Sequence, residues 1–423
     1  MNSPRTLSPR TAFWVAAAVI VHTLWTSAAP AVTYPLYAAQ WHLTPTVTTA
    51  IFAVYPIAVV VALLVFGNLS DHVGRRTAIL FGLAASLAGV LLFAVAQSVA
   101  WVFVGRALMG IGVGLSTSPA TAAMIEYSAG NGSQRASVVT TAATGVGFAL
   151  AMLVGGALIQ YAPFPMHLNF WILSAVLAVL SGAAWFLPRS QQRNAATRWR
   201  PGDIAIPRGM MLAFLTSAFA VTAGYTHGAV LLSIGAQVAH DLIGSGNALV
   251  NGAAIALFAI VGSVVSLFAK RIPALHSIAI GGVVTVVGMS TLMLSASRHS
   301  LALFTAAIAI AGIAYSLMVL GGLGLINAKA PTDRRAATLS AVYAIAYVMM
   351  GVVSLSLGVT ATRLGLEVGI DLGASAVATF GLIATVLALC SGAARNLLAF
   401  RKSTLRDCRD AASSNDKPRT FSS

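Results

Sequence analysis

Apolar residues fill this sequence in long runs that end at short polar segments. A helix that crosses about 30 Å of hydrocarbon needs about 20 apolar residues, and twelve runs of that length can be marked. They predict twelve transmembrane helices, at residues 12–35, 47–67, 75–97, 100–125, 137–160, 166–188, 210–237, 246–269, 274–296, 299–327, 336–361 and 371–394. The predicted fold class is therefore an all-α membrane protein.

Composition agrees with the pattern, because 58% of the 423 residues are apolar, only 8% are charged, and the mean hydropathy is +0.87. So few charged side chains could not cover the surface of a soluble protein of this size. The first run follows Arg5 and Arg10 and could also be a cleaved signal peptide. It continues to about Tyr34, which is too long for a signal core, so we interpret it as the first membrane helix.

The chain has a net charge of +15, and the positions of its basic residues indicate how it is oriented in the membrane. Of the 25 Lys and Arg, 22 fall in the two end segments and in every second loop, and Arg298 and Arg363 lie on the other side. Positive loops stay in the cytoplasm during insertion, so we expect both termini to be cytoplasmic and the chain to lie in the plasma membrane, the inner membrane of a bacterium. Scattered basic residues of this kind do not form a nucleic-acid surface.

The longest polar stretch between runs, residues 189–209, divides the chain into two sets of six helices. A shift of about 200 residues brings Arg135-Ala136 onto Arg335-Ala336, which favours a duplication, a known transporter architecture. We predict an amino-terminal bundle at 1–188, a cytoplasmic linker, and a carboxy-terminal bundle at 210–395. Residues 396–423 lack apolar periodicity and are predicted to be disordered and held near lipid headgroups by charge.

The loop between the second and third runs reads Gly67-Asn68-Leu69-Ser70-Asp71-His72-Val73-Gly74-Arg75-Arg76. Its glycines permit a tight turn and close backbone approach. The loop resembles the signature G-x-L-[AS]-D-x-x-G-R-[RK] of the major facilitator superfamily, which implies two six-helix bundles. The resemblance further implies a latch between the halves, in which Asp71 contacts the start of the eleventh helix. It also pairs Arg75 with an acidic residue that ends the fourth helix, here Glu126.

The fourth run carries a second stretch, Gly105 to Gly114, that is similar to the family pattern R-x-x-x-G-x-G. At about 100° per residue, one face of this helix collects Arg106, Gly110, Gly114, Thr117 and Thr121. Such a face suits a helix that lines a cavity, and the resemblance links the guanidinium of Arg106 to proton coupling. The alternative is that Arg106 extends to the nearby membrane surface without any function.

In antiporters of the same family, the fifth helix carries the pattern G-x-x-x-G-P-x-x-G-G. Here Gly147, Gly155 and Gly156 are present, whereas the central Gly-Pro is replaced by Ala151-Met152. The missing proline weakens the interpretation as a proton-exchanging exporter. The remaining glycines could also serve only for close helix packing.

Titratable groups are scarce within the predicted helices, since all ten acidic residues lie in loops, helix ends or tails. The remaining candidates for proton coupling are His22 and His227, because histidine titrates near neutral pH. For each, a hydrogen bond between packed helices is the alternative.

Aromatic and neutral polar side chains are the candidates for contact with a solute. They lie at helical spacing or on helices that line the centre in the resembling family: Trp25, Thr26, Thr117, Thr121, Tyr225, Thr226, Asn247, Asn251, Tyr315, Ser340, Tyr343 and Tyr347. Such a lining suits an uncharged, aromatic or weakly anionic solute better than a multivalent cation. Ordinary packing between helices is the alternative for each residue.

The sequence contains neither a phosphate-binding glycine loop followed by Lys-Ser/Thr nor a cluster with metal-ligand spacing. We therefore expect no enzyme, no cofactor and no metal. The prediction is a monomeric secondary transporter that exports a small organic solute in exchange for protons by alternating access. A metabolite symporter or facilitator is the alternative within transport, and a membrane sensor built on a transporter scaffold is the alternative from another class.

Overall fold

The computed structural model describes residues 6–67, 69–128, 132–189, 209–331 and 334–415, with the backbone alone at residues 71, 132–134 and 393–415. The first half of the chain consists of α1 (Pro9–Ala28), η1 (Ala29–Val32), α2 (Tyr34–Trp41), α3 (Pro45–Phe66), α4 (Leu69–Val73), α5 (Arg75–Ala94), α6 (Val99–Tyr127), α7 (Gly132–Tyr161) and α8 (Leu168–Trp185). The second half consists of α9 (Met211–Val230), the π-helical turns η2 (Leu231–Gly235) and η3 (Val238–Leu242), α10 (Ala248–Ala269), α11 (Ala274–Ser297), α12 (Leu301–Lys329), α13 (Arg335–Leu364) and α14 (Leu366–Asn415).

Twelve helical stretches among the described residues are long and apolar enough to cross a membrane, which confirms the predicted number. The first is longer than predicted and covers Pro9–Trp41, because Pro30 begins a 3₁₀ turn after which the chain continues as α2. The last begins at Leu366 rather than at residue 371. The first turn lies before the apolar run and holds Glu367, an acidic residue of the kind favoured at a helix start.

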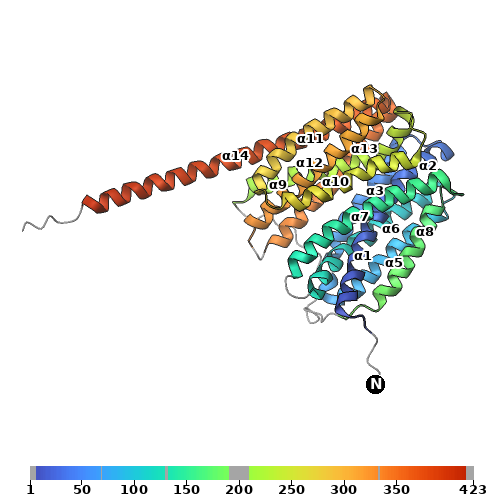
Figure 1. Cartoon of the computed structure of the whole chain (residues 1–423), viewed down its shortest axis with the longest axis horizontal. Helices are drawn as coiled ribbons and strands as arrows, with labels where there is room; N and C mark the ends of the chain where they lie inside the picture. The colour runs from blue at the N-terminus through green and yellow to red at the C-terminus, as the bar shows by residue number, and fades with distance from the viewer. Residues whose placement is uncertain (1–5, 68, 129–131, 190–208, 332–333, 416–423) are drawn as a thin grey trace, which may run out of the picture.

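The backbone of α14 continues without a break to Asn415, and the disorder of the tail stays a prediction. Figure 1 shows this red helix extending well beyond the rest of the bundle. The segment contains neither glycine nor proline after Gly392 and is rich in Ala, Leu and Arg, which are strong helix formers. Local propensity therefore favours a helix where the loss of apolar periodicity suggested none.

The two halves form separate groups of helices, blue to green and yellow to red in Figure 1. They meet along two pairs of helices, α3 with α13 and α7 with α10. In numbers of membrane spans these pairs are the second with the eleventh and the fifth with the eighth. A shift by six spans exchanges one pair for the other, which is the two-fold relation that a six-helix repeat requires.

Because successive spans alternate in direction, the loops fall at two ends of the bundle. One end, here called the basic face, carries Arg75, Arg135, Lys270 and Arg335. The other, here called the far face, carries the loops at 42–44, 95–98, 162–167, 243–247 and 298–300. The core between these faces is closely packed, and glycines at helix crossings bring backbones into direct contact. For example, Gly112 of α6 lies against Gly82 and Ser86 of α5.

Candidate functional site

Four tyrosines from three helices of the second half come together in one cluster, here called the tyrosine cluster. Tyr225 of α9 is its centre, with ring centroids 4.9 Å from Tyr347, 6.1 Å from Tyr343 and 6.4 Å from Tyr315. The sequence predicted each of these residues as a solute contact, and the structure places all four side by side.

Two phenylalanines extend the tyrosine cluster toward the first half of the chain. The Phe258 ring lies 5.1 Å from that of Tyr315, and 5.8 Å from that of Phe148 on α7. Tyr55 of α3 reaches the cluster from the other pair of interface helices, through an electrostatic interaction with Tyr347. The sequence analysis missed Phe148, Phe258 and Tyr55, since an aromatic residue within an apolar run gives no pattern that distinguishes it from lipid-facing neighbours.

Arg106 is fully enclosed by the first half, with 1% of its surface exposed. Its Nη1 donates a hydrogen bond of 2.9 Å to the carbonyl oxygen of Ser27. Its guanidinium carbon lies 4.7 Å from the centroid of the Tyr55 ring and 5.6 Å from that of Phe52. The alternative in which Arg106 extends to the membrane surface was therefore wrong, because the side chain turns inward between α1 and α3.

The face of α6 that follows Arg106 in the sequence packs against α3. A Cβ atom at Gly110 would lie 2.6 Å from the carbonyl oxygen of Tyr55, and one at Gly114 would lie 2.6 Å from the Cβ of Ala62. The hydroxyls of Thr117 and Thr121 donate to carbonyl oxygens one turn earlier in their own helix. The stripe that the sequence suggested as a cavity wall is thus largely the contact surface of α6 with α3.

The two histidines lie away from the contact between the halves. His22 of α1 donates through Nδ1 to the Val19 carbonyl oxygen, and its Nε2 accepts from the Ser86 hydroxyl of α5 at 3.4 Å. His227 of α9 donates through Nδ1 to the Ala223 carbonyl oxygen at 2.6 Å. Two residues along a helix correspond to about 200°, so His227 and Tyr225 face opposite sides of α9.

Several predicted solute contacts have structural roles. The Asn247 side chain caps α10 by accepting from the backbone of Leu249 and Val250. The Asn251 Nδ2 donates to the Ser245 carbonyl oxygen in the far-face loop at 2.9 Å. Contact of either residue with a solute stays a prediction. The hydroxyl of Thr226 donates within its own helix.

Three remaining candidates stay predictions. Trp25 and Thr26 are buried at the end of α1, and the Trp25 Nε1 and Thr26 Oγ1 atoms have no hydrogen-bond partner among the described residues. Ser340 is half-buried near the start of α13. Their surroundings neither join them to the tyrosine cluster nor assign them another role.

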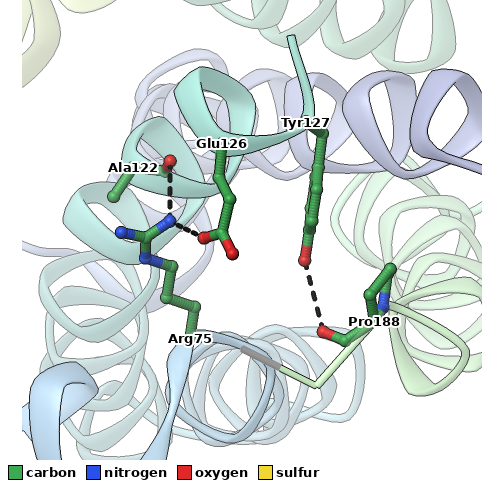
Figure 2. Close-up of polar contacts among 5 residues, drawn as sticks. All are labelled: Arg75, Ala122, Glu126, Tyr127 and Pro188. Atoms are coloured by element: carbon green, nitrogen blue, oxygen red, sulfur yellow. Dashed lines mark hydrogen bonds and ion pairs between the residues drawn. The ribbon is translucent and has the colours of Figure 1, made fainter. Parts of the chain in front are cut away.

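The loop that resembles the family signature lies at the basic face. Arg75 forms an ion pair with Glu126, and its Nη1 also donates to the Ala122 carbonyl oxygen at 3.1 Å (Figure 2). The hydroxyl of the neighbouring Tyr127 donates to the Pro188 carbonyl oxygen at 3.3 Å. The contact between Arg75 and Glu126 that the resemblance implied is therefore present, and it fastens α5 to the end of α6 within the first half.

The glycines of that loop differ in what they do. Gly74 has φ 84° and ψ 151° directly before α5, a conformation open to glycine but strained for other residues. Gly67 follows α3 in ordinary right-handed geometry. The side chain of Asp71, which the resemblance places against the eleventh span, lies outside the described side chains.

The degenerate antiporter stretch of α7 is a contact surface between helices. Gly147 lies against the backbone of Val21 in α1. On the α10 side, a Cβ at Gly156 would lie 2.7 Å from the Ala248 carbonyl oxygen, and Gly252 lies against the Met152 carbonyl oxygen. Ala151 and Met152, which replace the Gly-Pro of the pattern, are both buried.

Several hydrogen bonds join the two halves at the far face. The Thr46 backbone N–H donates to the Thr362 hydroxyl at 2.9 Å, and the two threonine hydroxyls lie 2.8 Å apart. Nearby, the Ser354 hydroxyl donates to the Thr49 carbonyl oxygen at 3.4 Å. On the second pair of helices, the Ala248 backbone N–H donates to the Gln160 side chain at 2.8 Å. The halves are thus fastened to each other at the far face.

Solved structures show the same fold at low sequence identity. A bacterial homolog of the human lysosomal transporter Spinster, in an inward-facing and unoccupied conformation, matches with a TM-score of 0.68 at 15% identity, covering 92% of this chain and 97% of that chain. A mutant of the peptide transporter POT in complex with sulfate matches with a TM-score of 0.71 at 17% identity, covering 90% and 94%. These likenesses establish a twelve-helix fold with two six-helix halves.

The fold and its apolar spans define an integral membrane protein of the transporter class. A family model of the Major Facilitator Superfamily matches residues 14–354, and the chain belongs to that family. A curated relative, the inner membrane transport protein YajR of Escherichia coli (strain K12), is 31% identical over 127 residues. That alignment covers 30% of this chain and spans 27% of the relative's length.

Proposed function

We propose that the chain is a secondary transporter that moves a small organic solute across the membrane by alternating access. The hydrogen bonds between the halves at the far face carry this proposal. Contacts such as that between Thr46 and Thr362 fasten one end of the interface and hold the far face shut in this state. When the halves rock about their interface, this contact opens and the opposite face closes, so that a central site is exposed to each side in turn.

The tyrosine cluster is the proposed solute site. It lies on the second half but reaches both interface helices of the first half, through Phe148 on α7 and Tyr55 on α3. A solute that touches the cluster therefore senses the relative position of the halves. Rings with hydroxyls bind flat apolar molecules that carry a few polar groups, since the faces supply contact area and the hydroxyls supply hydrogen bonds.

Coupled export in exchange for protons is the direction that we propose. Its support is the stretch around Arg106, which is similar to the family pattern associated with proton coupling, together with the burial of that guanidinium. A guanidinium does not release its proton in proteins, so Arg106 would act on a neighbouring group rather than carry the proton itself. His22 and His227 stay candidates by residue type alone, because neither faces the contact between the halves.

Uptake by a symporter or facilitator is the second candidate. The observation that favours it is the burial of Ala151 and Met152 in α7, where an antiporter of this family has Gly-Pro. We further propose a monomer in the inner membrane with both termini in the cytoplasm, on the strength of the basic loops. In that orientation the basic face is cytoplasmic, and the hydrogen bonds between Thr46 and Thr362 lie on the opposite side of the membrane.

Flux measurements in proteoliposomes test these proposals. The purified chain is reconstituted and loaded with a panel of neutral, cationic and anionic aromatic solutes, and efflux is followed with a proton gradient imposed in either direction. We expect saturable flux of at least one solute, faster when protons run against the solute. Flux that ignores the gradient favours a facilitator, flux that rises when protons and solute run together favours a symporter, and binding without any flux contradicts transport.

A further inference from the structure

We propose that Arg106 is the binding site for the carboxylate of an aromatic organic acid, and that such an acid is the transported solute. This inference rests on the proposed function and names its substrate class. The observation behind it is a permanently charged group with almost no contact with solvent and no opposite charge among the described side chains that surround it.

The absence of a counter-charge follows from the elements that pack against α6. These are α1, α3, α5 and α7, and their sequences contain no Asp or Glu at all. Of the acidic side chains that the structure describes, Glu126 is paired with Arg75, Asp241 with His240, and Glu367 and Asp371 lie in the first turns of α14. Arg106 therefore has no protein carboxylate within its packed surroundings.

A buried cation without a counter-ion is strongly destabilising, by several kcal/mol in general. The observed contacts offset only part of this cost. One Nη1 hydrogen bond goes to the Ser27 carbonyl oxygen, and the rings of Phe52 and Tyr55 face the guanidinium. The Nε atom of Arg106 is buried without any hydrogen-bond partner among the described residues. A donor of this strength, left unused, points to a ligand that supplies an anionic oxygen.

A second unused donor lies close by. The Tyr34 side chain is 2% exposed, its hydroxyl has no hydrogen-bond partner among the described residues, and it interacts electrostatically with Arg106. A guanidinium Nε–H and a phenol O–H can each donate to one oxygen of a carboxylate. We assign these two orphaned donors, on α2 and α6, to the oxygens of the acid.

Tyr55 connects this site with the tyrosine cluster and thereby sets the rest of the ligand. Its ring lies over the guanidinium on one side, and it interacts with Tyr347 on the other. An acid whose carboxylate reaches Arg106 has its remaining atoms directed at aromatic rings. An aromatic body fits these rings by offset or edge-to-face contact.

Equilibrium binding to the purified full-length chain tests this site. The probes are 2-naphthoate, the matched neutral 2-naphthamide, and sodium chloride, titrated at neutral pH while ligand-induced thermal stabilisation and tryptophan fluorescence are followed. We expect the wild-type chain to bind the acid at least about tenfold more tightly than the amide, as a charge-assisted pair should. In Arg106→Gln this preference disappears, and in Arg106→Lys part of it returns.

Tyr34→Phe keeps the proposal testable if the arginine variants do not fold, because it removes only one oxygen atom. It should weaken binding of the acid about threefold to tenfold and leave the amide unchanged. The control is Tyr37→Phe on the same helix, whose hydroxyl donates to the Met166 carbonyl oxygen, and which should not change the preference.

Equal binding of acid and amide by the wild-type chain overturns the proposal, as does an acid preference that survives both Arg106→Gln and Tyr34→Phe. Chloride that displaces the acid and stabilises the chain equally well assigns Arg106 to an inorganic anion and overturns the organic substrate. A preference that depends on Arg106 in a protein without flux supports the site and contradicts transport. Flux of neutral solutes without any preference for the acid supports transport and contradicts the anion site at Arg106.

Discussion

The guanidinium of Arg106 and the ring of Tyr55 lie face to face, 4.7 Å from carbon to ring centroid. Arg106 belongs to α6, in the interior of the first half, whereas Tyr55 belongs to α3, one of the helices that touch the second half. This contact therefore links the one buried charge of the described spans to the surface along which the halves meet. A change at Arg106 is expected to reach the interface through Tyr55.

The glycine before α5 gives a prediction on stability. Gly74 has a positive φ of 84°, so Gly74→Ala should lower the free energy of unfolding by about 1–3 kcal/mol. The control is Gly182→Ala in α8, where an added Cβ meets no atom within 4 Å. Alanine there should be neutral or stabilising, by up to about 1 kcal/mol. Thermal unfolding in detergent measures both, and equal midpoints would show that the loop relaxes around the substitution.

The crossing of α3 and α13 gives a prediction on conformational balance. A Cβ at Gly358 would lie against Thr49 and 2.8 Å from the Pro45 carbonyl oxygen. Overpacking costs about 1–3 kcal/mol, and here it opposes only the state in which the far face is closed. Gly358→Ala should shift the equilibrium between states by about 5- to 150-fold.

Labelling of cysteines introduced at the far face measures this shift. The matched control is Gly351→Ala on the same helix, where the nearest atom, the Ala53 carbonyl oxygen, is 3.7 Å from the added Cβ. That variant should label like the parent chain. A Gly358→Ala chain that also labels like the parent would show that the crossing accommodates a methyl group.

The signature loop gives a prediction on transport rate. If Asp71 acts as a latch toward the eleventh span, Asp71→Asn should slow solute flux by about tenfold while the chain stays folded. Proteoliposome flux measures the rate, and Arg76→Gln serves as a control, since Arg76 contacts the Trp185 ring within the first half. An unchanged rate in Asp71→Asn would remove the latch assignment.

The histidines give a prediction on pH dependence. Both are turned away from the contact between the halves, and His22 is held by Val19 and Ser86. His22→Gln and His227→Gln should therefore keep the pH profile of flux seen in the parent chain, although their rates fall if packing suffers. A displaced profile in either variant would make that histidine a carrier of the coupled proton.

The sequence was sufficient for the number of spans, because the need for about 20 apolar residues per crossing acts on each helix separately. It also sufficed for the contact between Arg75 and Glu126, and it selected the four tyrosines that cluster. In each case the residue type differs from its apolar surroundings. The capping role of Asn247 could have been predicted too, since an asparagine directly before an apolar run is a helix-start signal.

The other parts of the site depend on contacts between distant segments. The depth of Arg106 along α6 follows from the sequence, but its inward direction follows from α1 and α3, whose positions the sequence does not give. Likewise, Phe148 and Phe258 resemble any lipid-facing aromatic residue until α7 and α10 are brought together.

Alternating access is tested most directly by locking the far face shut. The side-chain oxygens of Thr46 and Thr362 are 2.8 Å apart, so Thr46→Cys with Thr362→Cys should form a disulfide in a chain that also carries Cys390→Ser and Cys408→Ser. We expect oxidation to reduce solute flux in proteoliposomes to the background rate, and a reductant to restore it, whereas Thr46→Cys alone is insensitive to both. A crosslinked chain that transports at the rate of the reduced chain would contradict transport by opening of this face.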